Sequence, residues 1–347
     1  MIESGPIRVL VVDDSLLVRE LLANILNKTP GMTVVGTARD GAEGFEMTQK
    51  LKPNVVTMDI EMPNMDGYQA IELIMAYQPT PILVVTGANI RDGKDITFKV
   101  LEIGALDLME KPTHAWGDEL KAKEIELVEK INLLSKVKVI RHVKGKVKAK
   151  KPKPAPSTHK EELIPVAIAS STGGPNALKT ILSDLTDGSH AGIVAVQHMS
   201  PGFLRGLTEW LDSNCSMRVK EAKRGDRITP DSVFVAPSGL HMVVEKEGII
   251  RLTDDPPFRG HRPSGNVLLK SVAESFGPLA IGIILTGMGD DGALGIKAIK
   301  DHGGRTIAQD EETSVVFGMP KAAIDLGAVD TVLPLDKISN ELKKIIY

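Results

Sequence analysis

The chain has 347 residues, 42% of them hydrophobic and 25% charged, which is typical of a globular protein with about two domains. A net charge of −3 and an aromatic content of 3% give no general affinity for nucleic acid, and no apolar run approaches the ~20 residues of a membrane span. The single cysteine, Cys215, cannot form a disulfide within the chain, and the N-terminus lacks a signal-peptide pattern. We therefore expect a cytoplasmic protein that is not inserted into a membrane.

The first part of the chain alternates short apolar runs with amphipathic helical patterns. The runs predict strands at residues 7–12, 32–37, 55–58, 81–85 and 106–109. Regular alternation of strand and helix predicts a doubly wound α/β domain with a five-stranded parallel sheet. An amphipathic pattern over 118–134 closes this domain, for which we predict the bounds 7–135.

Polar residues follow four of these strands. They are Asp13, Asp14, Asp59, Thr86 and Lys111. Because ligands bind at the carboxyl ends of parallel strands, we expect these side chains to share a site. Three carboxylates repel one another unless a cation neutralises them, and oxygen ligands suit Mg²⁺. A carboxylate beside that cation can attack a phosphoryl donor and become an aspartyl phosphate, whose oxygens would be hydrogen-bonded by Thr86 and Lys111. The alternative, that these are ordinary surface acids and a solvated lysine, would explain any one of them but explains all five at corresponding strand ends poorly.

Residues 7–133 resemble a response-regulator receiver domain. The resemblance rests on Asp-Asp after the first strand, an aspartate before Glu-Met-Pro, a threonine after the fourth strand and Lys-Pro after the fifth. It implies that Asp59 is the phospho-acceptor, that a histidine kinase is the phosphodonor, and that the Lys111–Pro112 bond is cis. It also implies four magnesium ligands: Asp13, Asp14, Asp59 and the backbone carbonyl of Glu61.

Residues 136–160 are rich in lysine and proline and contain almost no apolar side chains. Like charges with interspersed prolines are extended and solvated, so we predict a flexible basic linker between two domains. A nucleic-acid or membrane-surface patch is the alternative interpretation. No helix-turn-helix pattern accompanies the basic run, and we expect no nucleic-acid partner.

The second domain, predicted over 161–347, begins with a strand that ends in Ser-Ser-Thr-Gly-Gly and continues as a helix. Ser171 would lie on the turn, near the positive end of that helix. A strand-to-helix turn of this kind exposes the nucleophile of G-x-S-x-G hydrolases, although Ala169 replaces the first glycine here. An anion-binding turn or a structural loop would have the same pattern.

Two further strands of this domain end in residues that can assist a serine. The strand at 192–197 is followed by His198, and the strand at 280–285 is followed by Asp290 and Asp291. Three of the eight histidines are candidates for a base, with position favouring the first: His198, His241 and His261. Serine, histidine and aspartate at three strand ends are the parts of an acyl-transfer triad. Spacing does not decide between the two aspartates.

The middle of the domain has short apolar runs at 233–236, 242–245 and 248–252, of which the last two predict a β-hairpin. The fold expected for the second domain is therefore a doubly wound, mostly parallel α/β hydrolytic domain with a β-hairpin. Arg262 either contacts an acidic substrate or is an ordinary loop arginine.

This domain resembles the catalytic domain of the CheB family of chemotaxis protein-glutamate methylesterases. The matching segments are Ala-Ser-Ser-Thr-Gly-Gly, Gln-His-Met, His-Arg-Pro-Ser, Leu-Thr-Gly-Met-Gly-Asp-Asp-Gly and Val-Val-Phe-Gly-Met-Pro. The resemblance implies Ser171 as nucleophile, His198 as base and Asp291 as the orienting acid, with the N–H of Met288 stabilising the oxyanion. Asp290 then occupies a position where the family often has asparagine.

The two resemblances together imply a phosphorylation-regulated enzyme of chemotactic adaptation. Its expected reaction is hydrolysis of glutamate methyl esters on the cytoplasmic helices of chemoreceptors, with release of methanol, and deamidation of specific receptor glutamines. Mg²⁺ is expected to be needed only for phosphorylation of the receiver. Ester hydrolysis is expected to need no cofactor. The receiver is expected to pack over the catalytic strand ends until phosphorylation loosens it.

Two other functions are compatible with parts of the sequence. One is a response regulator with a nucleic-acid-binding output, which depends on the basic linker alone. The other is a non-catalytic docking module switched by phosphate, against which the complete serine, histidine and aspartate set argues.

Overall fold

The computed structural model describes residues 5–87, 96–112, 117–137, 139, 163–185 and 188–347. The chain forms two compact units, Met1–Val147 and Lys148–Tyr347. Most of the predicted linker, from residue 140 onward, lies outside the described residues, so the tether and the three domain bounds stay predictions. In the described part of the chain no helix is both long and apolar enough to cross a membrane.

The first unit is a five-stranded sheet of order β2-β1-β3-β4-β5 in which all neighbours are parallel. Its strands are β1 (Ile7–Val12), β2 (Met32–Ala38), β3 (Val55–Met58), β4 (Ile82–Thr86) and β5 (Asp107–Glu110). Its described helices are α1 (Leu16–Lys28), α2 (Gly41–Leu51), α3 (Gly67–Tyr77), α4 (Ile96–Glu102) and α5 (Asp118–Leu134). Each predicted strand is confirmed to within one residue at either end.

Local sequence signals explain how helices begin close to the strand ends. The carboxylate of Asp40 accepts a hydrogen bond of 2.9 Å from the N–H of Glu43 at the start of α2. Asp66 does the same for the N–H of Gln69 at the start of α3, also at 2.9 Å. Such N-caps each stabilise a helix by about 1 kcal/mol and fix where the chain turns away from the sheet.

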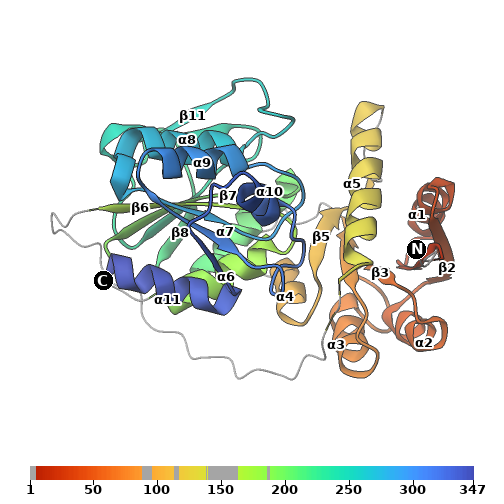
Figure 1. The fold of residues 1–347 in the computed structure, drawn as a ribbon. Helices are drawn as coiled ribbons and strands as arrows, with labels where there is room; N and C mark the ends of the chain where they lie inside the picture. Colours follow the sequence, from red (N-terminus) through yellow and green to blue (C-terminus); the bar gives the residue numbers. More distant parts are fainter. Residues whose placement is uncertain (1–4, 88–95, 113–116, 138, 140–162, 186–187) are drawn as a thin grey trace. The chain divides into compact units, whose positions relative to one another are not determined.

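The second unit is a seven-stranded parallel sheet of order β14-β13-β12-β6-β7-β9-β8. Its strands are β6 (Ile164–Ser170), β7 (Ala191–Gln197), β8 (Arg218–Glu221), β9 (Ser232–Val235), β12 (Ile281–Ile284), β13 (Arg305–Gln309) and β14 (Thr331–Leu333). Its described α-helices are α6 (Gly174–Asp184), α7 (Leu204–Asn214), α8 (Gly265–Phe276), α9 (Ala293–Asp301), α10 (Met319–Asp325) and α11 (Leu335–Ile346). Figure 1 shows α8 and α9 on one face of the sheet and α6 and α11 on the other, which is the doubly wound arrangement.

The predicted hairpin is confirmed as an antiparallel pair, β10 (His241–Val244) with β11 (Ile250–Thr253). Strands β8, β13 and β14 are not identified by the sequence analysis. Two of them are edge strands: β14 has three residues, and β8 exposes alternate side chains, so neither is a continuous apolar run. The expected cis bond at Lys111–Pro112 is wrong, since the cis bond among the described residues is Arg262–Pro263.

The order of strands reverses between β1 and β3 in the first unit and between β12 and β6 in the second, where a further reversal lies at the β9–β8 edge. Strand β6 is buried from Pro165 to Ser170, and β7 and β12 are buried along their whole length, as expected for central parallel strands covered on both faces. Loops that follow strands on either side of such a reversal diverge and leave room for a ligand. Both predicted sites lie at these points.

Candidate functional sites

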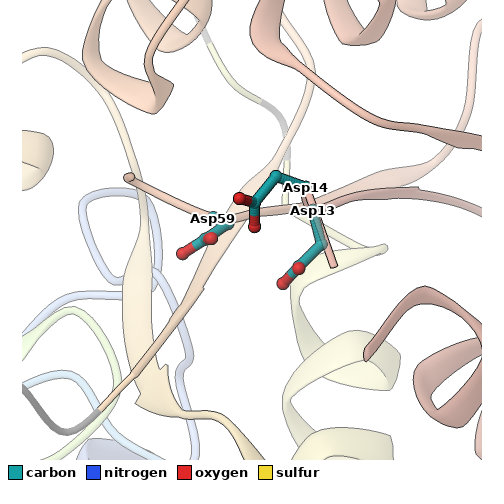
Figure 2. Close-up of side chains that lie close together, drawn as sticks. All are labelled: Asp13, Asp14 and Asp59. Carbon is teal, nitrogen blue, oxygen red and sulfur yellow. The ribbon is translucent and has the colours of Figure 1, made fainter. Parts of the chain in front are cut away.

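The first site is an acidic cluster in the first unit, formed by the residues after β1 and β3. One carboxylate oxygen from each of Asp13, Asp14 and Asp59 lies within 4.8 Å of the others (Figure 2). Asp13 and Asp59 are buried, whereas Asp14 is exposed. Nζ of Lys111 lies 2.7 Å from Oδ2 of Asp13 and 2.7 Å from Oδ2 of Asp59. The structure thus brings the four predicted charged groups together.

The electrostatics of the cluster leave its carboxylates incompletely neutralised. Burial raises the pKa of Asp59 to about 6, and the hydrogen bond and charge of Lys111 offset this only in part. Burial likewise raises the pKa of Asp13. Oδ2 of Asp13 is buried without an aligned hydrogen-bond donor in the described residues, although Lys111 is close. A hard divalent cation fits these oxygens, because it would supply the missing positive charge.

The other predicted receiver residues lie nearby. Thr86 is the last residue of β4 and is buried, and its carbonyl accepts a 2.8 Å hydrogen bond from the N–H of Lys111. Glu61 is exposed, and its carboxylate is not part of the acidic cluster. The role predicted for its backbone carbonyl therefore stays a prediction.

The second site is built around Asp291, which follows β12 and is 1% exposed. Its carboxylate accepts hydrogen bonds from the Ser264 hydroxyl at 2.6 Å and from the Gly265 N–H at 2.6 Å. Asn266 adds its side-chain amide at 2.8 Å and its backbone N–H at 3.2 Å. Burial alone would raise the pKa of this carboxyl, but His198, Ser264 and Gly265 outweigh it and lower the pKa to about 2. Asp291 is therefore a permanent anion near neutral pH.

His198 lies beside this anion. Its Nε2 lies 3.0 Å from Oδ2 of Asp291, although the ring N–H is not aligned for a hydrogen bond. The ring of His261 stacks on that of His198, with centroids 4.6 Å apart and planes 12° apart. His241 is buried in the hairpin, where its Nε2 lies 3.2 Å from the carbonyl of Pro256. Of the three candidate bases, His198 is the one in contact with an aspartate.

Ser171 follows β6 on the turn that leads into α6. Its N–H donates to the carbonyl of Thr286 at 3.0 Å, and the N–H of His198 donates to the carbonyl of Ser170 at 3.0 Å. A Cβ at Gly287 would lie 2.7 Å from Cβ of Ser171, so glycine is required for the loop after β12 to approach the serine this closely. In the described part of the chain no hydrogen bond joins Oγ of Ser171 to the His198 ring. Such contacts are commonly long before substrate binds.

Backbone N–H groups near Ser171 can serve as oxyanion donors. Within the described residues, the N–H groups of Met288 and Thr172 donate to no protein acceptor. Met288 follows Gly287, and Thr172 lies on the serine turn itself. Met288 is the donor that the sequence resemblance implies; Thr172 is a second candidate that the sequence analysis does not name.

Three further residues of this site are missed by the sequence reasoning. Ser264 holds Asp291, Gln197 holds the turns around Ser171 and His198, and Thr286 accepts the Ser171 N–H. Each belongs to a segment quoted for the family resemblance, which was the available signal. Arg262 does not reach the site: its guanidinium donates to the carbonyls of Asp254 and Asp255.

These observations define a class of protein. An all-parallel unit with an acidic cluster and a lysine at its strand ends is joined to an α/β unit that carries serine, histidine and aspartate at its own strand ends. This is a response regulator whose output domain has the parts of a serine hydrolase.

Comparison with known proteins identifies both units. Residues 166–342 match the family model of the CheB methylesterase, and residues 9–122 match that of the response regulator receiver domain. The chain belongs to the CheB methylesterase family, so the predicted family and fold class are confirmed.

The full-length relatives agree with this assignment. A protein of Anaeromyxobacter dehalogenans named protein-glutamate methylesterase/protein-glutamine glutaminase 2 is 46% identical over 98% of this chain and 97% of its own length. A protein of Pyrococcus abyssi named protein-glutamate methylesterase/protein-glutamine glutaminase is 43% identical over 98% and 94%, respectively. Among solved structures, the Thermotoga maritima CheB methylesterase catalytic domain matches with a TM-score of 0.52 and 41% identity, covering 53% of this chain and 99% of that one.

Proposed function

We propose that this chain is a phosphorylation-regulated protein-glutamate methylesterase of chemoreceptors that also deamidates receptor glutamines. The observation that carries the proposal is the fully hydrogen-bonded, ionised Asp291 in contact with His198, on strand ends adjacent to that of Ser171. The names of the full-length relatives supply the substrate class. They also favour an enzyme over a non-catalytic docking module.

Acylation begins with Oγ of Ser171, which attacks the ester carbonyl of a methylated glutamate while His198 takes its proton. With Nε2 turned toward Asp291, Nδ1 is the ring nitrogen left to face the serine. The permanent anion of Asp291 stabilises the imidazolium that forms. The carbonyl oxygen becomes an oxyanion, which the N–H of Met288 stabilises; one such donor contributes about 3–4 kcal/mol to the transition state.

Breakdown of the intermediate uses the same residues in reverse. His198 donates its proton to the departing methoxy group, so methanol leaves and an acyl-serine remains. Water then attacks this ester with His198 as base, which releases the glutamate carboxylate and restores Ser171. A glutamine side chain presents the same carbonyl with an amide as the leaving group, so protonation by His198 releases ammonia instead of methanol.

Regulation resides in the receiver unit. A carboxylate oxygen of Asp59 attacks a phosphoryl group from a histidine kinase and becomes an aspartyl phosphate, with Lys111 pairing one phosphoryl oxygen and the Thr86 hydroxyl another. Mg²⁺ held by Asp13, Asp14, Asp59 and the Glu61 carbonyl would neutralise phosphoryl charge during the transfer. Ester hydrolysis itself needs no metal in this scheme. Phosphorylation of the receiver raises the activity of the catalytic unit, either by relief of inhibition or by direct activation, through a shift between two states.

The partners follow from this chemistry. The substrates are glutamate methyl esters and glutamines on the cytoplasmic helices of chemoreceptors, and the reaction takes place in the cytoplasm. Nucleic acid has no role, because the only support for it is the basic run in the predicted linker.

The deciding experiment measures methanol release from a methylated chemoreceptor fragment, with and without a small-molecule phosphodonor and Mg²⁺. We expect release that rises with the phosphodonor, is lost in Ser171→Ala and is no longer stimulated in Asp59→Asn. Release that ignores the phosphodonor would retain the esterase and refute the switch. No release, together with a Ser171 inert to a fluorophosphonate probe, would favour the docking module.

A further inference from the structure

The side chain of Gln197 connects the nucleophile turn to the base. It is the last residue of β7 and is 4% exposed. Its Nε2 donates to the carbonyl of Ser171 at 2.8 Å and to the carbonyl of His198 at 2.8 Å. Its Oε1 accepts a 2.7 Å hydrogen bond from the hydroxyl of Ser170. One buried amide thus holds the backbone of both catalytic residues.

The partners of the amide determine its orientation. Two carbonyl oxygens can only accept, so they require the NH₂ group, and the Ser170 hydroxyl can donate to the remaining oxygen. If the amide were flipped, its oxygen would face two carbonyl oxygens. Every polar atom of Gln197 is satisfied in the observed orientation, which makes the contact rigid.

The surrounding packing is also specific for this side chain. Gly174, the first residue of α6, has its Cα against the amide: a Cβ there would lie 2.0 Å from Oε1 of Gln197 and 2.8 Å from Cβ of Ser170. The turn between β6 and α6 can therefore approach Gln197 only because position 174 has no side chain. The turn that carries Ser171 thus contacts the Gln197 side chain both through the Ser171 carbonyl and through Gly174.

We propose that Gln197 is a positioning residue that fixes Ser171 relative to His198 through hydrogen bonds to their two carbonyls. This inference rests on the proposed esterase function. It gives Gln197 no contact with substrate: the amide acts through the backbone of the nucleophile and the base. Displacing a catalytic group by about 1 Å costs on the order of 100-fold in rate, and we expect an effect of about 10- to 100-fold when the clamp is removed.

Gln197→Glu tests the proposal because it retains the shape and removes the donors. An ionised carboxylate cannot donate to either carbonyl, whereas a protonated one can donate to one of them. We expect the rate at which a fluorophosphonate labels Ser171 in the full-length protein to fall about 10- to 100-fold at pH 8. The ratio of variant to wild-type rate should then recover toward acid pH, because protonation restores one hydrogen bond.

Gly174→Ala and Ser271→Ala complete the experiment. The alanine methyl at 174 should displace the glutamine and slow labelling without altering Gln197 itself, so this variant tests the clamp even where Gln197→Glu fails to fold. Ser271 is a matched control, since its buried hydroxyl bridges Val244 N–H and Leu268 C=O at 2.9 and 2.7 Å elsewhere in the unit. Its replacement should lower the melting temperature and leave the labelling rate unchanged.

The outcomes distinguish a failure of the positioning role of Gln197 from a failure of the proposed esterase function. Normal labelling in Gln197→Glu at every pH, or in Gly174→Ala, overturns the positioning role while the esterase stands. Wild-type protein that neither labels at Ser171 nor releases methanol overturns the proposed function, and the positioning role with it. Slower labelling in both variants, with the control unaffected, supports the proposal.

Discussion

Both units have a buried carboxylate at a reversal of strand order in their sheet, but the pKa values of these two carboxylates are shifted in opposite directions. Both Asp59 and Asp291 lie beside the position where the order of parallel strands reverses. Burial raises the pKa of Asp59 to about 6, and Lys111, which also pairs with Asp13, lowers it only in part. Burial acts on Asp291 in the same direction, but the groups that donate to it prevail and lower its pKa to about 2.

The number of donors explains this difference. Asp291 accepts hydrogen bonds from the Ser264 hydroxyl, the Gly265 N–H and both nitrogens of Asn266, and no second carboxylate in the described part of the chain accepts from these donors. Asp59 accepts one bond from the Ile60 N–H and one from Lys111, which also pairs with Asp13. The carboxylate proposed to remain an anion therefore has several donors, whereas the one proposed to react with a phosphoryl group has a single donor on each oxygen.

Asp291→Asn should have the largest effect on the catalytic side of this comparison. An amide cannot stabilise the imidazolium of His198, and its NH₂ group would face donors that now satisfy a carboxylate. We expect methanol release to fall by about 10³–10⁴, the scale found when the orienting acid of a serine triad becomes its amide. Ser264→Ala, which removes one of several donors, should cost less than about tenfold. Activity of Asp291→Asn within tenfold of wild type would exclude Asp291 from the triad.

Lys111→Met tests the receiver site, in which a single lysine pairs with both Asp13 and Asp59. It leaves two buried carboxylates without their shared cation, which typically costs about 3–5 kcal/mol of unfolding free energy. Urea unfolding without divalent cations measures this loss, and added Mg²⁺ should restore part of it by replacing the missing charge. Lys121→Met, which removes an exposed pair with Asp118, is the control and should change stability by less than about 0.5 kcal/mol. Equal stability of the two variants would contradict the electrostatic description of the acidic cluster.

The sequence was sufficient for features that depend on pattern. Short apolar runs located the five receiver strands because each run is continuous and bounded by turns. It also placed Asp13 beside Asp59 in the first unit and Ser171 beside His198 in the second, since parallel strands of one sheet bring their carboxyl ends to one edge.

Other features depended on three-dimensional orientation, which pattern does not encode. Asp290 and Asp291 are adjacent in sequence, yet Asp290 is exposed and Asp291 is 1% exposed. Spacing could not separate them; only the family resemblance did. The contacts made by Gln197 and Ser264 were also not predictable, because each joins segments that are distant in the chain, such as Ser264 and Asp291.

The lowered pKa of Asp291 predicts an acid-sensitive contribution to stability. A folded pKa of about 2 against an unfolded value of 3.8 means that the contribution is present above about pH 4 and is lost as the pH falls toward 2. Two pKa units correspond to roughly 2–3 kcal/mol. Other carboxyls with lowered pKa, such as Asp40 and Asp330, add to acid unfolding. The test is therefore the difference in unfolding free energy between wild type and Asp291→Asn, which should shrink between pH 5 and pH 2.5; a constant difference would refute it.

Of these substitutions, Asp290→Asn should have the smallest effect on methanol release and on stability. It tests whether Asp290, the sequence neighbour of Asp291, contributes to the site. Asp290 forms a 2.6 Å ion pair with Arg259, and both side chains are about half exposed, at 53% and 54%. Solvent screens such pairs, so we expect a stability change of at most about 1 kcal/mol and methanol release within about threefold of wild type. A double-mutant cycle with Arg259→Ala separates the ion pair from other effects of either substitution. A loss comparable to that of Asp291→Asn would mean that adjacency to the triad acid, rather than burial and donor number, determines which carboxylate matters. Burial and the number of hydrogen-bond donors would then not explain the difference between Asp290 and Asp291.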